Sequence, residues 1–100
     1  MEYAIFEIET GKEGDAKMLE KDDLVSRQTI TIRNAKALGL AGDSTYIKIE
    51  GSPEALQRAL EIVEDNELGE KLSNDDAKDI YDKIAEEEES ASEGMGMIFD

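Results

Sequence analysis

Two pairs of adjacent carboxylates are the residues of this sequence whose types and spacing could do chemistry together. They are Asp22 with Asp23, and Asp75 with Asp76. Carboxylate oxygens are the ligands that Ca²⁺ and Mg²⁺ prefer, so these four aspartates are candidate metal-binding residues. The segment 65–76 does not complete a calcium loop of the EF-hand type, because its fifth and twelfth positions lack the required ligands. Divalent-cation binding therefore stands as an alternative function, beside solvated surface and helix caps.

The residue types that most often do catalysis are missing from the sequence. There is no histidine and no cysteine. This excludes serine–histidine and cysteine–histidine chemistry, thiolate metal sites and disulfides. Nothing marks a pair of carboxylates held at a glycosidase separation. We therefore expect a protein that is not an enzyme and that needs no cofactor.

The charge is strongly negative and unevenly distributed. The formal net charge is −15, yet residues 24–50 hold only two acids and four bases, whereas residues 51–100 hold sixteen acids and four bases. An excess of acid argues against binding to nucleic acid or to anionic membranes, because both need clustered lysine and arginine. The acidic C-terminal half could instead imitate nucleic acid and occupy a basic groove on a partner protein, which is a further alternative function.

Three segments have the alternation of apolar and polar residues that predicts β-strands. The segment from residue 26 is the clearest, with Ile30 and Ile32 on one face and Thr29, Thr31 and Arg33 on the other. A fourth, short strand is one interpretation of residues 16–20, and a loop is the other. The three predicted strands cover residues 1–9, 26–33 and 45–50.

Two main helices are predicted in the second half of the chain. Ser52 is a good N-cap and Pro53 suits the first helical position, so a helix should run from Pro53 to about residue 65. A second helix should begin after Ser73 or Asn74 and run into four glutamates at residues 86–89, where we expect fraying.

Strands in the first half and helices in the second indicate an α+β fold. We predict one domain over residues 1–89: a two-layer sandwich with a mostly antiparallel sheet of three to four strands and both main helices on one face. The other face would then be open, and it would carry Arg33, Tyr46 and Lys48. An open face of this composition could bind a polar or acidic surface on a partner.

Residues 90–100 differ in composition from the rest of the chain. They are rich in glycine and serine and then become apolar at Met97, Ile98 and Phe99. We predict a flexible C-terminal tail, and three roles remain open for it: an inert end, an edge strand that folds back, or a segment that docks on a partner.

These observations favour a non-enzymatic protein–protein interaction module whose partner the sequence does not identify. No signal peptide and no membrane span are visible, so we expect a cytoplasmic protein. A monomer is the expected state, because the sequence shows no well-shaped apolar patch to overcome the repulsion between two copies.

Overall fold

The computed structural model describes residues 2–99, and it describes side chains as far as residue 89. The strands are β1 (Glu2–Ile8), β2 (Thr29–Asn34), β3 (Thr45–Gly51) and β4 (Gly69–Lys71). The helices are α1 (Met18–Lys21), α2 (Pro53–Asp65) and α3 (Asn74–Phe99), with three short 3₁₀ segments, η1 (Asp15–Lys17), η2 (Val25–Arg27) and η3 (Lys36–Leu38). None of the helices in the described part of the chain is long and apolar enough to cross a bilayer.

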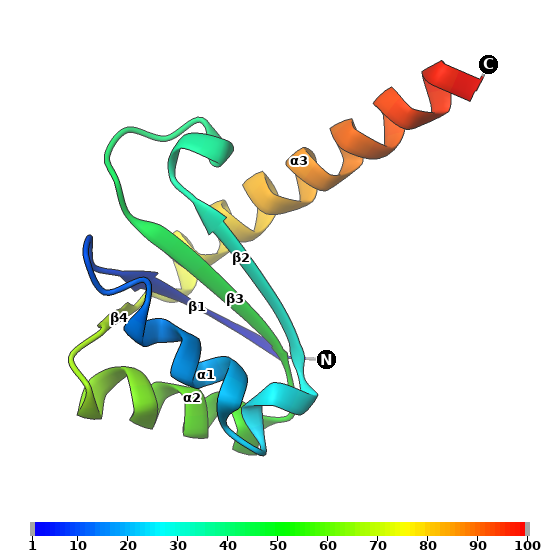
Figure 1. Cartoon of the computed structure of the whole chain (residues 1–100). Helices are drawn as coiled ribbons and strands as arrows, with labels where there is room; N and C mark the ends of the chain where they lie inside the picture. The colour runs from blue at the N-terminus through cyan, green and yellow to red at the C-terminus, as the bar shows by residue number, and fades with distance from the viewer. Residues whose placement is uncertain (1, 100) are drawn as a thin grey trace.

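The four strands form one sheet in the order β2-β3-β1-β4, and every neighbouring pair is antiparallel (Figure 1). Helical segments connect β1 to β2 and β3 to β4, so the chain has the β-α-β-β-α-β order of the split β-α-β, or ferredoxin-like, arrangement. The predicted α+β class and antiparallel sheet are confirmed.

One face of the sheet is covered by α1 and α2. Ala4, Phe6 and Ile8 alternate along β1 and pack with Val63 of α2 and Leu19 of α1 in one buried cluster. The predicted start of α2 is confirmed, since the hydroxyl of its N-cap serine accepts a hydrogen bond from the backbone N–H of residue 55 over 3.2 Å. Residues 16–20 are helical and not a strand, because Ala16 and Leu19, three positions apart, are both buried on one helical side.

The other face of the sheet is covered by α3, which differs from the prediction that both main helices share one face. Ile5 lies between two residues that face α2, so its side chain points to the opposite side. There it is buried in a second cluster with Tyr46, Ile80 and Ile84. Apolar residues on both faces of β1 therefore need a helix on each side, and α3 supplies the second one (Figure 1).

The last part of α3 takes in the segment predicted as a tail. The backbone is helical as far as Phe99. The side chains of Met97, Ile98 and Phe99 lie outside the described ones, so their docking role stays a prediction.

Candidate functional site at the edge of β2

Tyr46 and Lys48 do not lie on an open sheet face, because α3 covers them. Tyr46 is 9% exposed, and its hydroxyl donates a hydrogen bond to Glu7 Oε2 over 3.2 Å. Lys48 is 6% exposed, with its ammonium 3.1 Å from Glu50 Oε1 and 4.7 Å from the ring centroid of Tyr81. The expectation that this face is free to meet a partner is therefore wrong for these two residues.

Arg33 lies at the outer strand of the same face and is paired with α3. Its Nε donates to Glu87 Oε1 over 2.6 Å, and its Nη2 is 3.8 Å from Glu88 Oε1. Its Nη1 donates to the carbonyl oxygen of Ile32 over 2.8 Å. Arg33 is thus a link between the edge of the sheet and α3.

The four aspartates proposed as metal ligands are not brought together. Asp22 Oδ2 accepts hydrogen bonds from the backbone N–H groups of Leu24 and Val25 at the start of η2, and its Oδ1 pairs with Arg58 over 3.0 Å. Asp23 contacts Arg27 at the exposed surface. The pair at residues 75–76 lies in the first turn of α3. Within the described residues, no group of three or more acidic side chains is placed to hold a metal ion.

The outer edge of β2 is the feature of the fold best suited to binding. Within residues 2–99, no strand pairs with β2 on the side away from β3. The backbone N–H of Ala35 donates to Ser44 O, so residue 35 faces β3. Because this pattern alternates along an antiparallel ladder, Ile30, Ile32 and Asn34 direct their backbone groups away from β3. The Arg33 contact with the carbonyl of Ile32 agrees with this direction.

A hollow of about 300 Å³ lies next to this edge, between β2 and the first helical segment. We call it the β2 hollow. Ile32 lies at the boundary between the hollow and solvent and is 40% exposed, which is unusual for a large aliphatic residue in a sheet. The hollow is lined by Glu13, Ala16, Lys17, Glu20, Ile32, Asn34, Thr45 and Ile47.

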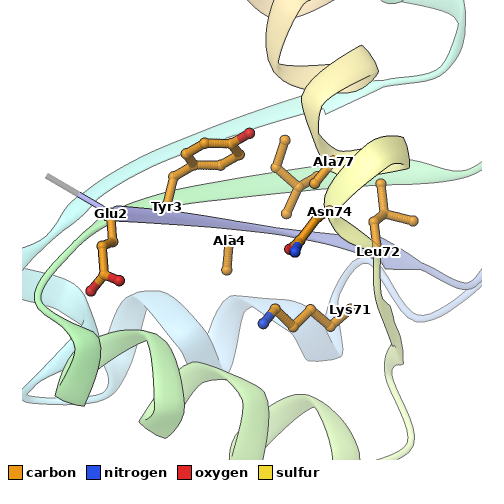
Figure 2. A pocket seen from close by; sticks show the side chains of 8 residues that line it. Glu2, Tyr3, Ala4, Lys71, Leu72, Asn74 and Ala77 are labelled. Atoms are coloured by element: carbon orange, nitrogen blue, oxygen red, sulfur yellow. The ribbon is translucent and has the colours of Figure 1, made fainter.

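A second hollow of similar size, about 300 Å³, lies beside the N-terminal half of β1. It lies where β4 is too short to continue along β1, because β4 pairs only with Phe6–Ile8 and no described strand follows the start of β1 on the side away from β3. Figure 2 shows Asn74 and Lys71 on one side of it and Glu2 on the other. The rim of this hollow carries both an acid, Glu2, and a base, Lys71, so it does not favour a ligand of one charge. The β2 edge is therefore the stronger candidate for a binding site.

Comparison of the chain with protein-family models, with curated proteins and with solved structures gave no match. The candidate site therefore depends on its geometry alone. The site could not be predicted from the sequence, because the alternation of Ile30 and Ile32 predicts a strand but does not indicate whether that strand has one neighbour or two.

Proposed function

We propose that this chain is a non-enzymatic protein–protein interaction module that binds an extended polypeptide segment along the outer edge of β2. One observation carries the proposal: the outward backbone groups of Ile30, Ile32 and Asn34 lie beside an exposed aliphatic side chain and the β2 hollow. In strand addition, main-chain hydrogen bonds supply affinity, and pockets for alternate side chains supply specificity.

The other edge of the sheet offers much less to a partner strand. β4 has three residues, and Glu70 and Lys71 are exposed on it. Short and charged edge strands are how proteins discourage edge pairing. β2 has six residues, contains no acid, and carries a single charge on Arg33, which already faces Glu87. An acidic molecule therefore presents its longer edge strand nearly free of repulsive charge.

Peptides selected from a random library on the full-length protein would test the proposal. A bound peptide should slow amide hydrogen exchange at Ile30, Ile32 and Asn34, since these N–H groups gain acceptors. Ile32→Lys should weaken binding at least tenfold. Leu24→Lys is the matched control, because Leu24 is the other large aliphatic residue exposed among the described ones, at 37%. Peptides that bind both variants equally, or that protect other amides, would contradict the proposal.

A further inference from the structure

We infer that the strand received at the β2 edge is β2 of a second copy of this chain, paired antiparallel about a two-fold axis at Thr31. This inference rests on the proposed function and names the occupant of the same edge. It departs from the expected monomer, because strand pairing needs backbone groups and not a large apolar patch.

The sequence of β2 is close to symmetric about Thr31. Thr31 has an isoleucine on each side, Ile30 and Ile32, and then a polar residue on each side, Thr29 and Arg33. In a pair of strands centred on Thr31, Ile30 of one copy is opposite Ile32 of the other. The two threonines at position 31 face each other, and Thr29 faces Arg33. Every opposed pair is therefore aliphatic with aliphatic or polar with polar.

The backbone directions fit the same register. Ile30 and Ile32 both have outward N–H and C=O groups, so they can form hydrogen-bonded pairs with each other across the new junction. A shift of one strand by two residues, which moves the axis to Ile32, would place Ile30 opposite Asn34 and Ile32 opposite itself. That register has one aliphatic pair instead of two, so the register centred on Thr31 is favoured.

The second copy also fills the space beside the exposed isoleucine. Ile30 and Ile32 lie on the face that carries α2, since Ile30 packs against the cluster formed by that helix. In the pair, Ile30 of the second copy lies next to Ile32 at the β2 hollow. The pairing therefore buries the aliphatic surface that the single chain leaves exposed.

The two copies of α3 would lie on the same face of the joined sheet. Each helix reaches β2 at Arg33 and continues past the sheet (Figure 1). Arg33 of the second copy is opposite Thr29 of the first, so the two Arg33 positions are about 13 Å apart along the strands. This separation exceeds the distance of about 8–10 Å between the axes of packed helices, so the two helices reach the new junction at separate points.

Net charge sets a distinctive salt dependence for this pairing. Each copy carries −15, so two copies repel at long range, although β2 itself holds no acid. Salt screens that repulsion and leaves the backbone hydrogen bonds in place. We expect the dimer to tighten when salt is raised from tens to hundreds of millimolar, whereas binding driven by opposite charges would weaken.

Disulfide trapping in the full-length chain tests the register, because the sequence has no cysteine to interfere. In the predicted pair, position 31 faces itself as a non-hydrogen-bonded pair with Cα atoms about 4.5 Å apart, within disulfide reach. Thr31→Cys should form a disulfide-linked dimer under mild oxidation. Thr29→Cys, the matched control on the same face, should not, since its two copies lie about 13 Å apart.

Mass measurement at several protein concentrations completes the test. The wild-type chain should pass from 11.1 kDa to twice that mass, and Ile32→Pro should remain a monomer because it removes an outward N–H without disturbing the ladder to β3. A wild-type monomer at all concentrations, or a dimer in which Thr31→Cys does not crosslink preferentially, would overturn the inference. Peptide binding at the edge would still decide the proposed function separately.

Discussion

The guanidinium of Arg33 and the carboxylate of Glu87 join the edge strand to α3 through a hydrogen bond of 2.6 Å. The same guanidinium donates to the outward carbonyl of Ile32. One side chain therefore fixes α3 over the sheet and also occupies an acceptor at the edge where we place binding. An incoming strand would compete for that acceptor without having to break the pair with Glu87.

Replacing Glu87 by glutamine should loosen α3 at this point. Both side chains are about one-third exposed, at 31% and 32%, so we expect a loss of about 0.5–1 kcal/mol in the free energy of unfolding, smaller at high salt. Denaturant unfolding measures it. Asp82→Asn is the control, because its ion pair with Lys78 is largely exposed and should contribute less. Equal losses of unfolding free energy in the two variants would show that the Arg33–Glu87 pair stabilises the fold no more than an exposed ion pair does.

Asp22 should make stability depend on pH in the acid range. The backbone N–H of Val25 is the largest cause that lowers the pKa of Asp22, and Arg58 lowers it further. Because this pKa is lower in the folded chain, the carboxylate stabilises the folded state at pH values above its pKa in the unfolded chain. The stabilisation is lost as pH falls through its pKa in the folded chain. Asp22→Asn should therefore lower Tm at neutral pH, with a difference that shrinks in acid.

Asp23→Asn is the matched control for that pH series. Asp23 makes only exposed contacts with Arg27 and Ser26, so its replacement should change Tm little across the same range. Thermal unfolding followed by circular dichroism would measure all three proteins. A constant difference between Asp22→Asn and wild type from neutral to acid pH would contradict the assigned role of Asp22.

Tyr46 should make the stability of the fold depend on pH in the alkaline range. Burial raises the pKa of Tyr46 above its ordinary 10.0, and the neighbouring Glu7 raises it further. The contribution of Tyr46 to stability should be constant at pH values below its ordinary pKa. It should fall as pH rises toward the pKa of Tyr46 in the folded chain, because in that interval the Tyr46 hydroxyl ionises only in the unfolded chain. Absorbance titration should show a late tyrosine transition that is absent in Tyr46→Phe. A late transition that survives in Tyr46→Phe would refute this assignment.

Local sequence signals were enough to predict the elements that depend on neighbouring residues. Ser52 and Pro53 predicted the first residue of α2. What could not be predicted depends on long-range pairing. The side of the sheet on which α3 packs follows from Ile5 and Tyr46, and the status of β2 as an edge follows from the sheet order.

The candidate site was harder to predict for the same reason. Arg33, Tyr46 and Lys48 have the composition of a solvated face, and only the position of α3 shows that two of them are buried. Lys48 is tolerated there because its ammonium meets both Glu50 and the ring of Tyr81. The near-symmetry of β2 about Thr31 was readable in the sequence, but it gains meaning only once that strand is known to lie at an edge.

Gly69 should not tolerate a side chain, because β1 passes directly beside it. A Cβ at this position would lie 1.9 Å from the backbone oxygen of Glu7, which cannot move without breaking the β1–β4 pairing. Gly69→Ala should cost about 1–3 kcal/mol of unfolding free energy. Gly51→Ala is the control: the three atoms nearest to its Cβ all belong to the flexible side chain of Gln28, which can move by giving up two exposed hydrogen bonds. Similar unfolding free energies for the two variants would contradict the close approach at β4.

Glu67 should be replaceable by glycine with a gain in stability. It follows the end of α2 with φ of 51°, the left-handed conformation in which a Cβ costs roughly 1 kcal/mol. The backbone N–H of Leu68 donates to Val63 O, and that of Glu67 donates to Glu64 O, which is the Schellman pattern that normally has glycine at this position. Glu67→Gly should therefore raise the free energy of unfolding by up to about 1 kcal/mol, reduced by the greater freedom of glycine in the unfolded chain. Glu70→Gly, in an ordinary β conformation, should lower it, and a loss in both variants would mean that residue 67 is not strained.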